Sequence, residues 1–153
     1  MKMTLRHAND TDFEEIAAWI TDSSACMRWA GSFVAFPFGH QNLSCLLHKP
    51  GVVSLAMTNN LGQLLGFAQY WPRDEQRTHL GRIIVNPKSR GQGIGKVLCE
   101  QLIGATMAAT NTPIISLRVY RDNHSAHHLY QQLGFKACEE ESNAEVLAME
   151  KLR

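Results

Sequence analysis

The sequence lacks the features that mark a membrane protein or a disulfide-stabilised protein. No stretch approaches the roughly 18 apolar residues that a membrane-spanning helix requires. The four cysteines are scattered, with no Cys-x-x-Cys pair and no histidine at zinc-ligand spacing. The first dozen residues are too polar for a signal peptide. We therefore expect reduced thiols, a cytoplasmic location, no membrane partner and no metal. The cysteines are Cys26, Cys45, Cys99 and Cys138.

A strong excess of either charge is also absent. Fifteen Lys and Arg side chains are balanced by fourteen Asp and Glu side chains, which leaves a formal charge of +1. Proteins that bind extended polyanions usually carry a strongly basic surface. We therefore expect no nucleic acid partner. The balance says nothing about a small anion that binds at one place.

Repeats, low-complexity tracts and linker-like segments are missing, so we predict a single domain over residues 1–153. Apolar periodicity and turn residues predict the order βααβββαβαββ, which is an α/β (α+β) chain with a mixed sheet and antiparallel parts. Asn9 and Asp12 predict a capping box at the first helix. Periodicity fails from Ala25 to Gly39, which we interpret as an ordered loop. The other predicted helices cover 41–48, 93–109 and 124–133, and the predicted strands cover 4–6, 52–57, 63–70, 79–85, 114–119, 135–141 and 145–151.

A glycine-rich segment joins a strand to an amphipathic helix between Val85 and Lys96. Its residues favour anion binding, because a helix start offers unpaired amides and glycines let a phosphate approach the backbone. A Walker loop would need Gly at 90 and Ser or Thr at 97, where this chain has Arg90 and Val97. A dinucleotide fingerprint would need Gly at 96 and an acidic residue about 20 positions on, and both are missing. The segment therefore indicates an anion other than these nucleotides.

Two motifs together resemble the GNAT superfamily of acetyl-CoA-dependent N-acetyltransferases. The first is the Arg/Gln-x-x-Gly-x-Gly/Ala motif, present as Arg90-Gly91-Gln92-Gly93-Ile94-Gly95 after Val85-Asn86-Pro87. The second is Asn-x-x-Ala-x-x-x-Tyr-x-x-x-Gly-Phe, present from Asn123 through Tyr130 to Phe135. The order of the predicted elements agrees with the family over nearly the whole chain.

The resemblance implies a mixed, mostly antiparallel sheet of six to seven strands, flanked by helices and splayed between the fourth and fifth strands. The pantetheine arm of acetyl-CoA would lie in this split and pair with the backbone of Ile83, Ile84 and Val85. Asn123 would contact the cofactor near its thioester. The pyrophosphate would be held by the glycine-rich segment, namely Arg90, Gly91, Gln92, Gly93, Ile94, Gly95 and Lys96.

The resemblance also places Tyr130 as the general acid that protonates the departing thiolate. The chain departs from the family pattern at the general base, since Arg118 stands where many relatives that modify ribosomal proteins have a glutamate. His79 is a candidate base, because the usual pKa of His lies near neutrality. A solvated or hydrogen-bonded histidine at a strand end, and proton relay through water, are the open alternatives.

Other patterns have two interpretations. Trp29, Phe33 and Phe36 lie where the family forms its acceptor pocket, but they equally fit packing under the sheet. His124, His127 and His128 have helical spacing, but no carboxylate or Cys joins them in sequence, so we expect a solvated helix face. Cys99 fits a small buried hydrophobe better than a nucleophile.

We therefore predict an N-acetyltransferase that moves an acetyl group from acetyl-CoA to a small-molecule or peptide amine within a ternary complex. The alternative from another class is a sensor module that binds acyl-CoA without catalysis. A longer acyl donor is an alternative within the enzyme class. We expect a monomer or a homodimer, and the sequence does not identify the acceptor.

Overall fold

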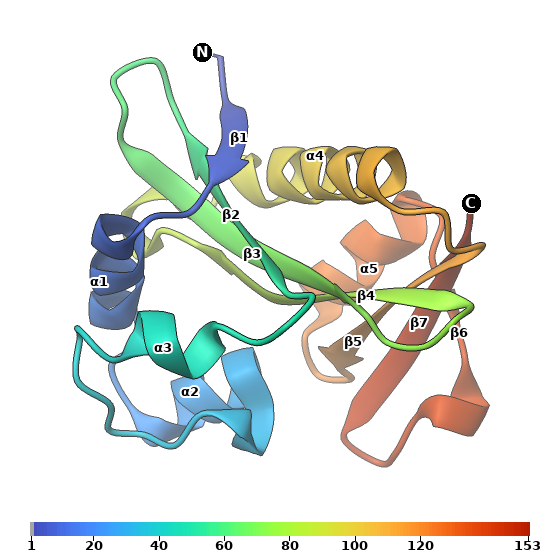
Figure 1. Ribbon diagram of the computed structural model, residues 1–153. Coiled ribbons are helices and arrows are strands. Elements are labelled where there is room, and N and C mark those ends of the chain that lie inside the picture. Colours follow the sequence, from blue (N-terminus) through green and yellow to red (C-terminus); the bar gives the residue numbers. More distant parts are fainter. Residues whose placement is uncertain (1) are drawn as a thin grey trace.

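The computed structural model describes residues 2–153, which form one mixed sheet covered by helices on both faces (Figure 1). The sheet has seven strands in the order β1-β2-β3-β4-β5-β7-β6. Neighbouring strands are antiparallel except β4 and β5, which are parallel. This confirms the predicted mixed, mostly antiparallel sheet. The strands are β1 (Thr4–His7), β2 (Val53–Thr58), β3 (Leu64–Pro72), β4 (Arg77–Val85), β5 (Ile114–Tyr120), β6 (Lys136–Ala137) and β7 (Val146–Leu152).

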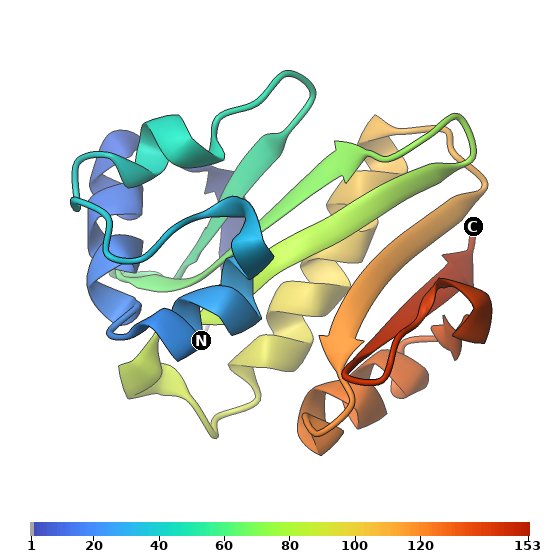
Figure 2. The same ribbon diagram turned by 90° about the horizontal axis from the view of Figure 1, so that it is seen from below.

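The parallel pairing of β4 and β5 is short. It joins Arg77, Thr78 and His79 to Ile114, Ile115 and Ser116. Beyond these residues β4 still pairs with β3 and β5 still pairs with β7, but β4 and β5 no longer pair with each other. Figure 2 shows the strand that follows helix α4 moving away from its green neighbour along its length. The sheet is therefore open between its fourth and fifth strands, which is where the resemblance placed the split.

The helices divide into two groups, one on each face of the sheet (Figures 1 and 2). The first group is α1 (Asp10–Trp19), α2 (Ser23–Ala30) and α3 (Leu43–Leu47), and it packs on a core that contains Phe67 and Ile84. The second group is α4 (Ile94–Ala109) and α5 (His124–Gln132), and it packs on a core that contains Leu117 and Met149. Both faces of β3 are thus buried, which explains its nearly continuous apolar sequence.

Local capping signals account for the helix starts. The Asn9 side chain accepts from the amide of Asp12 over 3.0 Å, and the Asp12 carboxylate accepts from the amide of Asn9 over 2.8 Å. This reciprocal pair confirms the predicted capping box at α1. Buried Asp12 also pairs with Arg6 of β1, which ties the helix to the edge of the sheet.

Two predicted elements differ from the structure. The interpretation of 25–39 as a loop was wrong for its first part, because Ser23–Ala30 forms α2, capped by Asp22, whose carboxylate accepts from the amide of Ala25. The predicted strand at 135–141 is reduced to Lys136–Ala137, and a short 3₁₀ turn, Glu139–Glu141, follows it. Three consecutive glutamates at this point favour a solvated turn over a strand.

A β-bulge distorts β4 where it passes β3. Phe67 pairs with Ile84 and Gln69 pairs with Gly81, so β4 has one more residue in this interval than β3. Arg82 lies in the bulge with φ at 49°, the left-handed region that a non-glycine residue rarely adopts. The bulge therefore sets the direction of the Arg82 side chain, as described below.

Candidate active site

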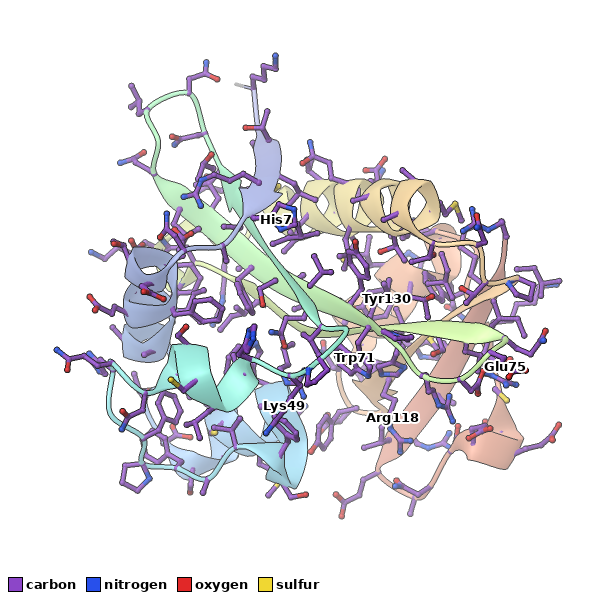
Figure 3. The ribbon with its side chains drawn as sticks, viewed as in Figure 1. His7, Lys49, Trp71, Glu75, Arg118 and Tyr130 are labelled. Atoms are coloured by element: carbon purple, nitrogen blue, oxygen red, sulfur yellow. The ribbon has the colours of Figure 1, made fainter. Side chains whose placement is uncertain are left out.

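The split between β4 and β5 holds two adjoining cavities of about 250 Å³ and 130 Å³. They share a wall formed by α2, β4 and β5, which includes Arg82 and Arg118. Trp71 and His79 line the larger cavity, while Asn123 and Tyr130 line the smaller one. In Figure 3, Trp71 and Arg118 lie near one another below β4, and Tyr130 lies above it. The cleft thus has two compartments that meet beside the centre of β4.

The start of α4 presents a row of backbone amides without partners. No hydrogen bond within residues 2–153 uses the amides of the segment Gly91–Lys96. Gly91 and Gly93 have φ of 77° and 76°, and a Cβ on either would meet nothing within 4 Å. Gly93 is the N-cap of α4 and provides no side-chain cap. This concave, uncapped helix start fits an anion such as a pyrophosphate.

The edge of β4 beyond His79 is also unpaired on the side that faces β5. Ile83, Ile84 and Val85 continue this edge toward the glycine-rich segment. The Asn123 side chain accepts from the amide of Ala126 over 3.3 Å as the N-cap of α5, and the residue lines the smaller cavity. An extended molecule with amide groups could therefore add to β4 from the glycine-rich segment toward Tyr130.

Tyr130 is buried on α5, and its side chain lies against the Cys99 thiol of α4 and the Phe135 ring. Burial raises the pKa of Tyr130, and the neighbouring thiol raises it further. Burial likewise raises the pKa of Cys99 to about 12. Tyr130 therefore stays protonated at neutral pH and can donate a proton into the cleft, while Cys99 stays a thiol and is no nucleophile.

His79 lies at the last position of β4 that pairs with β5. Its Nδ1 is 2.8 Å from the hydroxyl oxygen of Ser116, and its ring lies 5.1 Å from the Trp71 ring. Burial lowers the pKa of His79 to about 4, and the charges of Arg73, Arg118 and Arg82 lower it further in the same direction. The imidazole is therefore neutral across the physiological range.

Arg82 extends from the bulge into an aromatic sandwich. Its guanidinium carbon lies 4.6 Å from the ring centre of Phe33 and 4.6 Å from that of Trp71. Its Nη1 donates to Oε1 of the fully buried Gln69 over 2.7 Å. Two aromatic faces and one amide hold this cation in place.

The structure brings some of the predicted pocket residues to the cleft and not others. Trp29 lines both cavities and also packs against Phe67. Phe33 reaches the site through Arg82, and about half of its side chain is exposed. Phe36 packs against Phe38 at 5.9 Å, within the core under α1–α3. Both interpretations of the aromatic segment thus apply, each to different residues.

Sequence reasoning missed Trp71, Arg82 and Gln69. Trp71 and Gln69 lie on β3, and only their register against β4 brings them beside Arg82. In the sequence, Arg82 is a single charged residue within a mostly apolar segment, and no turn or bulge motif surrounds it. An arginine between Gly81 and Ile83, in the middle of a buried strand, was the one available signal.

No group of three or more His, Cys, Asp or Glu side chains within residues 2–153 is placed to hold a metal ion. Over the same residues, no helix is long and apolar enough to cross a membrane.

Comparison with known proteins places this architecture. The profile of the Acetyltransferase (GNAT) family matches residues 7–135. Mycothiol acetyltransferase of Streptomyces coelicolor is 30% identical over 92 residues, which cover 60% of this chain and 28% of that protein. Spermine/spermidine N(1)-acetyltransferase of Bacillus subtilis is 30% identical over 82 residues, which cover 49% of this chain and 54% of that protein. The chain spans about half, or less, of the length of the curated relatives that it matches.

A solved structure shares the fold over nearly its whole length. Spermidine N-acetyltransferase from Vibrio cholerae, in complex with CoA and spermine, superimposes with a TM-score of 0.81 and 21% sequence identity. The alignment covers 98% of this chain and 95% of that one. The split sheet is thus a fold that a known acetyltransferase uses.

Proposed function

Because the chain belongs to the Acetyltransferase (GNAT) family, we propose that it transfers an acetyl group from acetyl-CoA to a primary amine within a ternary complex. One observation carries the proposal. The free amides of Gly91–Lys96 follow the end of β4, whose edge beyond His79 does not pair with β5, and the smaller cavity beside this edge is lined by Ile83, Asn123 and Tyr130. The larger cavity adjoins the smaller one, and we assign it to the amine.

The cofactor fits the residues along this edge and at the start of α4. The amides of Gly91–Lys96 would bind the pyrophosphate, with Arg90 and Lys96 adding positive charge. The backbone of Ile83, Ile84 and Val85 would pair with the amide groups of the pantetheine arm, as an added strand pairs with a sheet edge. Asn123 would contact the arm near the thioester. Acetyl-CoA supplies the activated acetyl group, and the protein supplies position and protons.

Tyr130 is the proposed general acid. When the amine nitrogen bonds to the acetyl carbon, the carbon–sulfur bond breaks and the sulfur leaves with the electron pair. The Tyr130 hydroxyl gives its proton to this sulfur and regains one from solvent or from the amine. The donor is protonated at neutral pH, because the usual pKa of tyrosine is already about 10 and burial only raises the pKa of Tyr130 further.

The cationic cleft provides a reason for the amine to react in its neutral form. An alkylamine with a pKa near 10.4 is neutral in only about one molecule in 2,500 at pH 7. The charges of Arg82 and Arg118, which lower the pKa of His79, would lower that of a nearby ammonium in the same way. With a pKa of about 4, neutral His79 is a weak base. We therefore assign it to orienting the amine and to passing the proton of the amine on to water.

The relatives support an amine acceptor in general terms, since the names of two of them describe acetylation of spermine or spermidine. Small-molecule amines and peptide amines both remain within the proposal. A sensor that only binds acyl-CoA is distinguished by experiment, because it would bind the cofactor and release no thiol. A longer acyl donor is distinguished by comparing acetyl-CoA with longer acyl-CoA thioesters.

Two measurements test the proposal. Acetyl-CoA is expected to raise the melting temperature, while ATP and NAD at equal concentration leave it unchanged. A thiol-release screen with acetyl-CoA over small amines and short peptides is expected to identify acceptors that release CoA above the hydrolysis background. Stabilisation without thiol release from any amine would instead establish the sensor, and no stabilisation would refute the cofactor site.

A further inference from the structure

Arg82 places a guanidinium in the cleft without a carboxylate partner. Its one hydrogen bond within residues 2–153 goes to neutral Gln69, and its Nε is buried with no partner in the same part of the chain. Burial lowers the pKa of Arg82, yet an arginine remains charged at neutral pH because its ordinary pKa is above about 12. A partly buried charge without a counter-ion costs free energy, so this position is suited to a ligand that brings negative charge.

The arginine is also rigidly held. The Oε1 atom of Gln69 points to Arg82, because Nε2 of the same amide donates to the Ser54 hydroxyl over 2.8 Å and to the Leu47 carbonyl over 3.3 Å. The rings of Phe33 and Trp71 hold the two faces of the guanidinium. A fixed, planar donor set of this kind favours a planar or tetrahedral anion over a diffuse counter-ion.

The rest of the cleft has the same sign of charge. Arg118 lines both cavities and makes no ion pair within residues 2–153. Arg28 also lines both, but its charge is balanced by Asp122 at 2.6 Å. No Asp or Glu is among the lining residues of either cavity. A polycation would therefore enter a site that repels it.

From this arrangement we propose that the acceptor amine carries an anionic group, a carboxylate or a phosphate, which Arg82 and Arg118 bind in the larger cavity. The inference rests on the proposed acetyl transfer and names the class of its substrate. It also separates this chain from the relatives named for polyamines, whose acceptors carry only positive charge.

The cofactor does not account for these arginines. Its phosphates have a separate place at the amides of Gly91–Lys96, beyond the far end of β4. Trp71 and His79 line only the larger cavity, whereas Tyr130 and Asn123 line only the smaller one, where the thioester would lie. Arg82 lines both cavities, but the Trp71 ring that lies against its guanidinium lines only the larger one, so we assign the guanidinium to the acceptor side of the cleft.

The test compares amines that differ only in the anionic group. Thiol release with each standard L-amino acid is compared with that of its own carboxamide. O-phosphoethanolamine is compared with ethanolamine in the same way, and spermidine serves as the cationic reference for both sets. We expect at least one anionic amine to exceed its neutral counterpart and spermidine by ten-fold or more in kcat/KM. The carboxylate and phosphate pairs show which anion is bound. A preference for spermidine or for the neutral amines would overturn the inference.

A binding measurement separates this inference from the proposed function. With CoA present, calorimetric titration with N-acetyl amino acids or N-acetyl-O-phosphoethanolamine should show binding at least ten-fold tighter than that of the corresponding amides or N-acetylethanolamine. If no amine releases thiol, the proposed acetyl transfer fails, and this titration alone decides the anion site. Equal or undetectable binding of the anionic and neutral compounds would overturn it.

Three variants locate the effect. Arg118→Gln is expected to reduce the preference for the anionic amine by ten-fold or more with the acetyl-CoA affinity unchanged, and Arg118→Lys should restore part of it. Arg121→Gln is the matched control, because Arg121 is an exposed arginine next to β5 that pairs with Glu139 and lines neither cavity. An equal loss in both Gln variants, or a loss that follows acetyl-CoA affinity, would refute the assignment.

Discussion

His79 and Ser116 face one another across the last residue pair that joins β4 to β5, with Nδ1 and Oγ 2.8 Å apart. This hydrogen bond occupies one ring nitrogen and leaves Nε2 for the larger cavity, which His79 lines. The same pair therefore makes the last link between β4 and β5 before the two strands separate. It also fixes the orientation of an imidazole beside the proposed acceptor site.

Acidification should destabilise the protein through His79. Its pKa is about 4 in the folded chain against a usual value of 6.5, so the unfolded chain binds more protons between these two pH values. Stability is therefore expected to fall as the pH is lowered from 6.5 toward 4. Denaturant unfolding of wild type and His79→Gln across this range provides the measurement, and the variant should lose less stability. His124→Gln, at the exposed start of α5, is the control, and parallel curves for wild type and His79→Gln would refute the prediction.

Replacing Tyr130 by Phe removes the proposed proton donor and keeps the ring that packs against Phe135. We expect kcat to fall by about 10- to 1,000-fold, because a general acid contributes roughly this factor, while acetyl-CoA binding persists. Steady-state thiol release and calorimetry measure the two effects. Cys99→Ala, which removes the neighbouring thiol, should leave kcat within a few-fold. Unchanged turnover in Tyr130→Phe would remove the residue from the mechanism.

Gly93→Ala should weaken acetyl-CoA binding more than it weakens the fold. Both Gly93 and Gly62 have φ near 77°, and a Cβ on either meets nothing within 4 Å. Each Ala variant should therefore lose about 1–2 kcal/mol of stability from the left-handed backbone. Only the Gly93 variant places a methyl group in the anion cradle, so only its acetyl-CoA Kd should rise, by ten-fold or more. Equal Kd values in the two variants would show that the cradle does not bind the cofactor.

Gly81→Ala tests the aromatic sandwich. A Cβ on Gly81 would stand 2.5 Å from Cη2 of Trp71. The indole must therefore move, and the Arg82 guanidinium loses its contact with one of its two aromatic rings. We expect the acceptor KM to rise at least five-fold with little change in acetyl-CoA affinity. Gly104→Ala on α4, where a Cβ meets nothing within 4 Å, should instead stabilise the helix by about 1 kcal/mol and leave kinetics unchanged. An unaltered acceptor KM in Gly81→Ala would indicate that Trp71 does not shape the acceptor site.

Local signals in the sequence predicted the parts of the protein that local interactions build. The capping pair Asn9 and Asp12 and the glycine-rich start of α4 each act within one turn of the chain, and both match the structure. Helix α2 escaped prediction because it is short and its partner surface, the core around Phe67, comes from later strands. On the acceptor side, Trp29 and His79 were predicted and line the larger cavity, whereas Trp71 and Arg82 escaped prediction for the same reason.

The chemistry around Arg82 depends on a register that no segment specifies alone. The bulge exists only relative to β3, and it brings Gln69 and Trp71 beside an arginine that lies many residues away. Tyr130, in contrast, was predicted as a site residue from the family motif, although its contact with Cys99 arises only when α4 and α5 pack together. Motifs thus predicted residues for the cofactor side of the cleft, whereas the contacts around Arg82 depend on tertiary packing.

The row of free amides at the start of α4 has a practical consequence for handling the protein. Because the backbone makes this site, any tetrahedral oxyanion of suitable size can occupy it. At buffer concentrations, which far exceed the cofactor concentration used in a binding assay, sulfate or phosphate should therefore occupy the site weakly, raise the melting temperature and compete with acetyl-CoA, so the apparent Michaelis constant depends on the buffer salt. Assays in chloride and in sulfate at equal ionic strength should therefore give different apparent Michaelis constants for acetyl-CoA with the same protein.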